Sequence, residues 1–256
     1  MRQWIISLDR LLRGQTTRLA DLGAGTIEIP VTGFVVVIWL LGMIYGGCMG
    51  LFSLTPGGSG HPMQLLASTV KLPLLFLLTL LVTFPSLYVF NALVGSQLLA
   101  MQVLRLLIAA LAVMLATLAS IGPIVGFFSF STTSYSFMIV LNVVVFSVAG
   151  LLGLAFLLQT LRRMTLAMRS AASPPPPDGA EEARQTPLDG TGEQFLAPHV
   201  NTIFRIWVAV FGLVGAQMAW VLRPFIGNPQ QPFTWFRRPY SNFFEAVIVA
   251  LRHLAN

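Results

Sequence analysis

Long apolar runs recur along the sequence, separated by short polar stretches. Each run approaches the length of about 20 residues that a helix needs to cross the roughly 30 Å hydrocarbon core of a bilayer. This pattern predicts an all-α integral membrane protein, a bundle of about five transmembrane helices. The predicted spans are residues 31–54, 72–93, 98–121, 137–159 and 203–222.

Two amphipathic segments flank these runs and are predicted to be helices in the membrane interface. Residues 2–19 place apolar side chains at helical spacing with arginines between them. We interpret this segment as a membrane anchor rather than a partner-binding helix. Residues 243–254 form a second apolar face after Asn242 and Glu245, which have the spacing of a capping box. This second helix is too short to span a bilayer and is expected on the membrane surface or on the bundle.

Changes in composition divide the chain into segments. Pro174 to Pro177 form a polyproline run among charged, Gly, Ala and Thr residues, which predicts a disordered cytoplasmic linker. A Pro-rich docking site for a partner is the less favoured interpretation. The segments are an N-terminal amphipathic region (1–30), a four-span unit (31–170), the linker (171–200), the fifth span (201–223) and a tail rich in proline and aromatic residues (224–256).

Prolines predict where the helices bend or end. Pro73 is expected in the first turn of the second span, where its missing amide costs little. Pro85 is expected to kink the middle of the same span. The uncharged stretch 122–135 is predicted to connect the third and fourth spans.

The composition supports this class of protein and disfavours others. Of 256 residues, 55% are hydrophobic and 9% are charged, whereas roughly a quarter of a soluble domain is charged. The net charge of +6 is spread along the edges of the apolar runs, so the sequence shows no basic patch for nucleic acid. A single cysteine, Cys48, excludes an internal disulfide and a cysteine-based zinc site.

The distribution of Lys and Arg predicts a cytoplasmic N-terminus. In that orientation ten of the 15 basic residues fall inside, as the positive-inside rule favours. The tail then lies outside, which leaves four arginines on the translocated side against the rule. Long side chains that reach lipid headgroups relieve part of this cost. These four are Arg223, Arg237, Arg238 and Arg252.

Gly42, Gly46 and Gly50 form two consecutive G-x-x-x-G motifs in the first span. Small residues at this spacing let another helix approach closely. We favour a neighbouring helix of the same chain over a second copy of the protein. Small residues in the third and fifth spans are the expected partners.

Polar groups are few within the spans. No Asp, Glu or His lies in any of them, which disfavours a proton- or cation-coupled transporter. Asn91, Asn142 and Gln217 are candidates for interhelical hydrogen bonds. Arg105 is the deepest charge and a candidate for binding a phosphate headgroup or lining a pore. Snorkelling of its side chain toward the interface is the favoured alternative.

The sequence contains no recognisable set of catalytic or metal-binding residues. The three histidines lie in loops or the tail, and no phosphate loop, zinc motif or nucleophile elbow is present. We therefore predict a protein that is not an enzyme, with no catalytic residue, no metal site and no cofactor.

The tail carries most of the candidate binding residues. Its prolines stiffen a connection rich in aromatic side chains, so we predict that it is ordered and docked. Glu245 is its only acid and is expected to pair with an arginine. A docking surface for a partner and an aromatic belt in the interface are equally favoured. Together with Asn91 and Arg105, the candidates are Arg223, Trp235, Arg237, Asn242 and Glu245.

Four segments carry a resemblance to known proteins: 71–79 (KLPLLFLLT), 84–93 (FPSLYVFNAL), 223–227 (RPFIG) and 241–247 (SNFFEAV). They are similar to a group of uncharacterised bacterial multi-span membrane proteins, which implies a location in the bacterial inner membrane. The arrangement of five spans, a cytoplasmic N-terminus and a proline-containing second span also resembles the Yip family. That resemblance implies a membrane-organising adaptor and assigns no residue-level site.

These observations lead to two functional hypotheses. The first is a non-enzymatic membrane scaffold or adaptor that contacts the lipid bilayer and a protein partner or a second copy of the chain, and no nucleic acid. The alternative is a channel, permease subunit or lipid-handling protein with a polar path beside the kinked second span, near Pro85 and Asn91.

Overall fold

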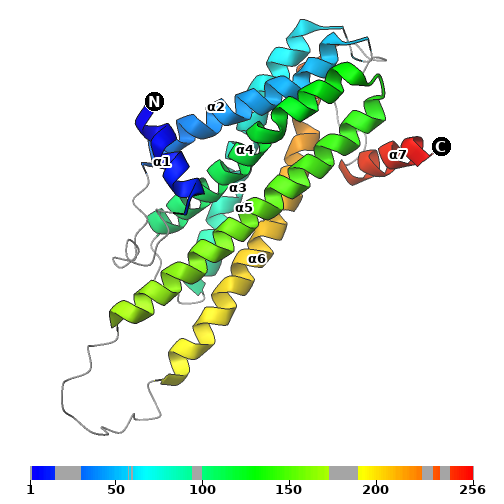
Figure 1. Ribbon diagram of the computed structural model, residues 1–256. Helices are drawn as coiled ribbons and strands as arrows, with labels where there is room; N and C mark the ends of the chain where they lie inside the picture. The colour runs from blue at the N-terminus through cyan, green and yellow to red at the C-terminus, as the bar shows by residue number, and fades with distance from the viewer. Residues whose placement is uncertain are drawn as a thin grey trace, which may run out of the picture.

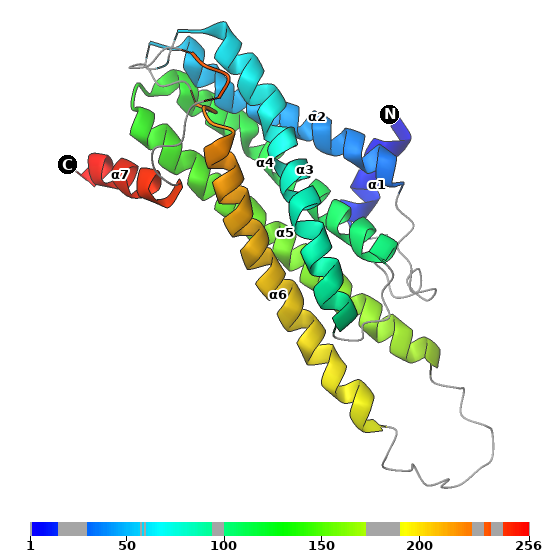
Figure 2. The same ribbon diagram turned by 180° about the vertical axis from the view of Figure 1, so that it is seen from behind.

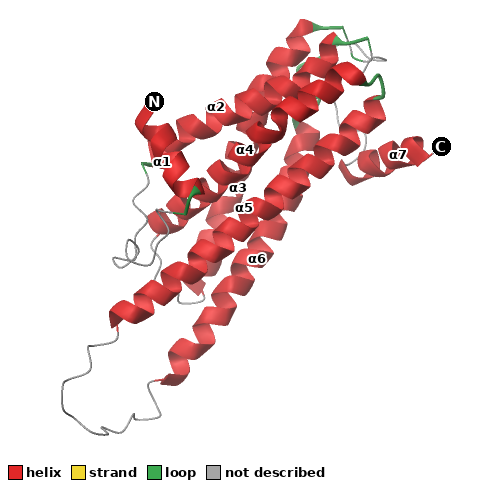
Figure 3. Ribbon diagram, in the orientation of Figure 1, coloured by secondary structure: helices red, strands yellow, loops and turns green. Residues whose placement is uncertain are grey.

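The computed structural model describes residues 2–14, 30–56, 58, 60–93, 100–172, 190–226, 233–236 and 243–255. Every regular element in these ranges is helical (Figure 3). The elements are α1 (Arg2–Leu12), α2 (Val31–Gly50), the short 3-10 helix η1 (Leu51–Leu54), α3 (Pro62–Leu93), α4 (Ala100–Ser131), α5 (Tyr135–Ala172), α6 (Gly190–Val221) and α7 (Phe243–Ala255).

Helices α2 to α6 form an elongated bundle (Figure 1). Helix α2 packs against α3 and α4, α5 packs against α4, and α6 packs against α3 and α5. Helix α1 crosses α2 and α4 at one end of the bundle, whereas α7 lies at the other end against α5 and α6 (Figures 1 and 2). We call this second end the α7 end.

Within the described residues, four helices are long and apolar enough to cross a membrane: Val31–Leu54, Pro62–Ser86, Met101–Ser131 and Tyr135–Arg163. They support the expected class, an all-helical membrane protein. In α6 the side chains are described from Ile206 onward, and Ile206–Val221 is apolar. A fifth span and an interfacial position for α1 and α7 therefore stay predictions.

Two expected helix boundaries are wrong. Helix α3 begins at Pro62, so Pro73 lies in the helix interior rather than in its first turn. Helix α4 continues through Pro123 to Ser131, so most of the expected connection 122–135 is helical. The residues before Leu72 and the first part of the stretch 122–135 are therefore helical. In α3 the polar side chains bond to other segments of the folded chain.

The expected linker is shorter than the sequence suggested. Helix α5 continues to Ala172 and α6 begins at Gly190, so residues 190–200 are helical. Residues 173–189, which include the polyproline run, lie outside the described part of the chain.

The glycine face of α2 packs against α3 of the same chain. A Cβ atom on Gly46 would lie 2.6 Å from the carbonyl oxygen of Ser68, and one on Gly42 would lie 2.8 Å from the Cβ of Pro73. At Gly50 the nearest atom, in Leu65, would be 3.0 Å away. A side chain at Gly42 or Gly46 would therefore displace α3, and one at Gly50 would press on Leu65. The partner is α3, not the small residues of the third and fifth spans.

A buried polar pair joins α2 to α5 across the core. The Tyr45 hydroxyl donates a hydrogen bond of 2.8 Å to Oδ1 of Asn142, and the Asn142 amide donates to the Met138 carbonyl at 2.8 Å. Both side chains are buried, and polar groups in hydrocarbon must find such partners. The interhelical bond expected of Asn142 is confirmed, and Tyr45 is its partner.

Candidate functional site

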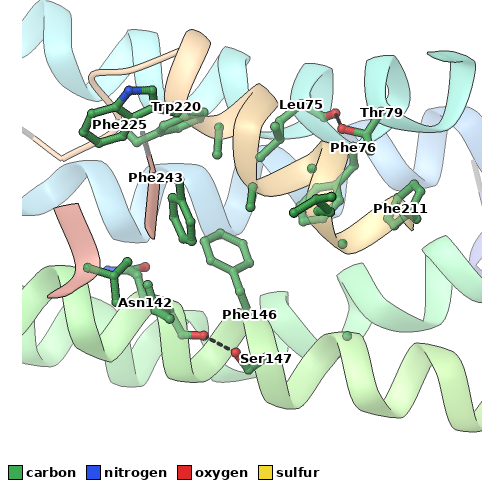
Figure 4. A pocket seen from close by; sticks show the side chains of 18 of the residues that line it. Leu75, Phe76, Thr79, Asn142, Phe146, Ser147, Phe211, Trp220, Phe225 and Phe243 are labelled. Carbon is green, nitrogen blue, oxygen red and sulfur yellow. Dashed lines mark hydrogen bonds between the residues drawn. The ribbon is translucent and has the colours of Figure 1, made fainter. Parts of the chain in front are cut away.

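A large cavity lies between the second half of the bundle and α7. Its volume is about 1510 Å³, above the roughly 300–1,000 Å³ that is usual for small-molecule sites. Its walls come from α3, α4, α5, α6, the segment after α6, and α7, with Met49 from α2. Figure 4 shows aromatic side chains that line it, among them Phe76, Phe146, Phe211, Trp220, Phe225 and Phe243.

The polar side chains labelled in these walls are engaged within the protein. The Thr79 hydroxyl donates to the Leu75 carbonyl at 2.7 Å, and the Ser147 hydroxyl donates to the Val143 carbonyl at 2.7 Å (Figure 4). The Asn142 amide serves the Tyr45 pair described above. Such hydroxyls, bonded back to their own helix, leave a surface that is mainly apolar. A hydrocarbon chain suits these walls.

One tryptophan fixes the distance between α6 and α3. The indole Nε1–H of Trp207 donates to the Thr83 carbonyl at 3.1 Å, and the side chain is buried. Trp207 and Trp220 both line the cavity, and the helical rise of 1.5 Å per residue separates them by about 20 Å. The cavity is therefore longer than half of a hydrocarbon core about 30 Å thick.

Ionisable side chains line the cavity near its α7 end. Arg223 lies just beyond the C-terminal end of α6. Glu245 lies in the first turn of α7, and His253 lies in the last turn of α7. The Arg223 guanidinium carbon lies 3.8 Å from the centroid of the Trp220 ring, a stacked cation–π contact. Among the described lining residues, these three are the charged or histidine side chains.

Three polar residues on one face of α3 hold the segment after α6; we call Gln64, Ser68 and Lys71 the tail clamp. The Gln64 amide donates to the carbonyls of Pro224 at 3.0 Å and Phe225 at 3.1 Å. The Ser68 hydroxyl also donates to the Phe225 carbonyl. Each of the three clamp side chains is buried. Their hydrogen bonds satisfy backbone carbonyls of the segment after α6, which is not helical and so has no helical hydrogen bonds of its own.

Lys71 extends the tail clamp to the next described segment. Its ammonium donates to the carbonyl of Trp235 and, at 3.5 Å, to that of Pro224. The same ammonium lies 4.9 Å from the centroid of the Phe236 ring and 6.0 Å from that of Trp235. Lys71 is 2% exposed, so a buried cation is stabilised by carbonyl oxygens and aromatic faces. The described parts of the tail are docked, as expected.

The structure separates the predicted binding residues. Arg223 and Glu245 line the cavity, and Trp235 is half exposed beside Lys71. Arg105 is half buried in the second turn of α4 and does not line the cavity. The Asn91 side chain, Arg237 and Asn242 lie outside the described residues.

The tail clamp and the cavity were not predicted from the sequence. A signal for the clamp exists, because positions 64, 68 and 71 follow the i, i+4, i+7 spacing of one helical face. No signal marks the cavity, since its lining residues resemble those of any apolar span. Pro85 is exposed and is not among the lining residues, so the polar path expected near Pro85 and Asn91 stays a prediction.

Comparison with family models, curated proteins and solved structures found no match to this chain. The site is therefore interpreted from its own residues.

Proposed function

We propose that the protein is a lipid-handling membrane protein that binds a membrane amphiphile in the cavity between α3, α5, α6 and α7. The observation that carries the proposal is the asymmetry of the cavity. Its body is apolar and aromatic, and its charged side chains, Arg223 and Glu245, lie at the α7 end. An amphiphile has the same division between a hydrocarbon chain and a polar headgroup.

The dimensions support a lipid chain as the occupant. A headgroup near Arg223 places its chain along α6, where the lining extends about 20 Å to Trp207. One leaflet is about 15 Å deep, half of the roughly 30 Å core. The cavity is also partly open, which gives a chain lateral access from the bilayer.

Crowding the cavity tests the proposal. A Cβ on Gly212 meets nothing within 4 Å, and one on Gly150 meets only the end of Met114 at 3.9 Å. Both glycines line the cavity. The double variant Gly150→Phe/Gly212→Phe should fill space without displacing backbone. Lipid that copurifies with the full-length chain, counted by native mass spectrometry, should fall several-fold.

The matched control places the same side chain on an outer face. Ile206 and Val144 are 59% and 53% exposed and do not line the cavity. The double variant Val144→Phe/Ile206→Phe should keep the wild-type lipid content. Equal lipid content in both double variants and the wild type would remove the proposal.

A scaffold is the second candidate, and the exposed aromatic side chains beside the tail clamp favour it. Trp235 is 50% and Phe236 64% exposed, although Lys71 fixes the backbone between them. A photoreactive residue at Phe236 should form discrete protein adducts in native membranes. These adducts should weaken when Lys71→Met releases the segment. Labelling of lipid alone would eliminate the scaffold.

We assign the chain an N-in, C-out topology with α6 as a fifth span, in a bacterial inner membrane. Support comes from the positive-inside count and from the positions of α1 and α7 at opposite ends of the bundle (Figure 1). A cysteine at Asn228 should react with an impermeant thiol reagent in intact cells, and one at Ser173 should not. The reverse pattern would invert the topology.

A further inference from the structure

The exposure of the lining residues shows on which side the cavity is open. The lining residues from α3 are buried, and those from α4 are buried or half-buried. Among the described lining residues, the exposed ones come from α5, α6 and α7. Helices α5 and α6 run side by side, with α7 at one end of the pair (Figures 1 and 2). Helices α3 and α4 therefore form the floor of the cavity, and its opening lies along α5, α6 and α7.

Leu151 on α5 and Leu213 on α6 mark the edges of this opening. Leu151 is 65% exposed and Leu213 is 54% exposed, and both line the cavity. A side chain that is exposed and also lines a cavity lies where the cavity meets the surface. Gly150 and Gly212, the adjacent positions in the chain, also line the cavity, and a Cβ atom on Gly212 would meet nothing within 4 Å. Two bulky side chains thus flank an opening that the glycines leave free.

These edge residues lie at the depth of the hydrocarbon core. Helix α5 supplies the stretch Tyr135–Arg163, which is long and apolar enough to cross a membrane. Leu151 lies about 3 Å along the helix axis from the centre of this stretch, Ala149. Leu213 lies in the middle of the apolar stretch Ile206–Val221. In a bilayer, the opening at these two leucines therefore faces hydrocarbon.

Helix α7 continues the opening away from the bilayer centre. Phe244 and Val249 line the cavity and are exposed, so the opening forms a slot from the middle of the bilayer to the α7 end. We propose that this slot is a lateral portal through which a two-chain phospholipid passes between the bilayer and the cavity, and that Leu151 and Leu213 set the rate of exchange. This inference rests on the proposed lipid-binding function and adds the route of entry.

A lateral route suits a phospholipid because both parts of the molecule keep their preferred surroundings. The chains pass from hydrocarbon to apolar walls without entering water, which would be strongly unfavourable. The headgroup stays at the level of α7. The segment after α6 closes another side of the cavity, because Pro224 and Ile226 line it, are buried, and belong to the segment that the tail clamp holds.

The volume of the cavity supports an occupant with two chains. A cavity of about 150 Å³ holds benzene, with its six carbon atoms. By that measure, a cavity of about 1510 Å³ has room for roughly 60 carbon atoms. Two acyl chains of ordinary length therefore fit.

The experiment measures exchange separately from occupancy. The full-length chain is loaded with phosphatidylethanolamine, phosphatidylglycerol and phosphatidylcholine that carry deuterated chains, and is mixed with excess bicelles of the same lipids without label. Native mass spectrometry follows the labelled lipid over time. Leu151→Trp/Leu213→Trp narrows the slot and should slow exchange several-fold. Leu151→Ala/Leu213→Ala widens it and should accelerate exchange several-fold. The number of lipids bound at equilibrium should be the same in both variants and the wild type.

The control places the same side chains elsewhere on the same helices. Val144 and Ile206 are exposed and do not line the cavity, so Val144→Trp/Ile206→Trp should exchange lipid at the wild-type rate. If the Trp variant of the slot fails to fold, judged by circular dichroism and gel filtration, the Ala variant still tests the portal. It removes only exposed side-chain atoms and adds none.

The outcomes distinguish this inference from the proposed function. Wild-type exchange rates in both slot variants would overturn the portal, and so would a lower number of bound lipids in them, which would make the leucines part of the binding wall. Lipid binding itself stands in those cases if Gly150→Phe/Gly212→Phe loses lipid. If that variant keeps its lipid, or the wild type retains no labelled lipid, both proposals fail. A wild-type dimer that the Trp variant dissociates would assign the slot to a second copy of the chain instead.

Discussion

Particular glycines in the two halves of the bundle have different surroundings. In the α2–α3 half, Gly42 and Gly46 leave no room for a Cβ atom because α3 backbone or side chain lies within 3 Å. In the α5–α6–α7 half, Gly212 faces open space. The first half is closed by helix contact, and the second borders a partly open cavity of about 1510 Å³. Close packing therefore holds α2 against α3, and looser packing in the other half leaves the space of the candidate site.

The tail clamp links these halves. It lies on α3, which packs on α2 through the glycine face and on α6 through Trp207. Its bonds to residues 224–225 and to Trp235 position the chain that leads from α6 to α7. A rigid α2–α3 pair thus sets the position of the charged end of the cavity.

The largest expected effect is a contrast between two glycines. Gly46→Leu should destabilise the fold by about 3 kcal/mol, because its side chain must displace the α3 backbone near Ser68. Gly212→Leu should change the free energy of unfolding by close to zero. Detergent-induced unfolding followed by circular dichroism measures both. Equal losses would mean that the two halves are packed alike.

Removing the clamp cation should have the next largest effect. Lys71→Met leaves the carbonyls of Trp235 and Pro224 without their donor, at a cost of about 2 kcal/mol. We expect faster proteolysis between residues 224 and 242, with α2 and α3 unaffected. Val70→Met, at the exposed neighbouring position, is the control. Unchanged cleavage would show that the tail is held by α7 alone.

Trp207→Phe should have a smaller effect at the junction of the halves. The change removes the indole donor to the Thr83 carbonyl and keeps most of the aromatic area, so we expect a loss of about 1 kcal/mol. Cysteine pairs across α3 and α6 should also cross-link less efficiently in membranes. An unaltered cross-linking yield would place the attachment of α6 elsewhere.

The smallest expected effect concerns the buried pair between α2 and α5. Hydrogen bonds between membrane helices average about 0.6 kcal/mol, and a double-mutant cycle of Tyr45→Phe and Asn142→Leu should give that coupling. A coupling near zero would mean that packing, rather than this bond, joins the two halves.

The sequence alone determined the class of the protein and the type of its elements. Uncharged runs long enough to cross hydrocarbon predict helices, because every backbone group in a bilayer must be bonded within its own segment. The G-x-x-x-G spacing showed that one face of α2 admits close contact, and the stiff aromatic tail suggested that it docks. These inferences rest on short-range periodicity, which a single sequence contains.

Tertiary structure decided which faces meet and where space remains. The glycine face could contact any helix with a smooth surface, and only the fold selects α3. The carbonyls that bind Lys71 are more than 150 positions away in the chain, so the sequence near Lys71 does not reveal them. The cavity depends on how α3, α5, α6 and α7 are placed relative to one another. Apolar side chains that face lipid, a neighbour or a cavity are alike in sequence, so their surroundings depend on the assembled bundle.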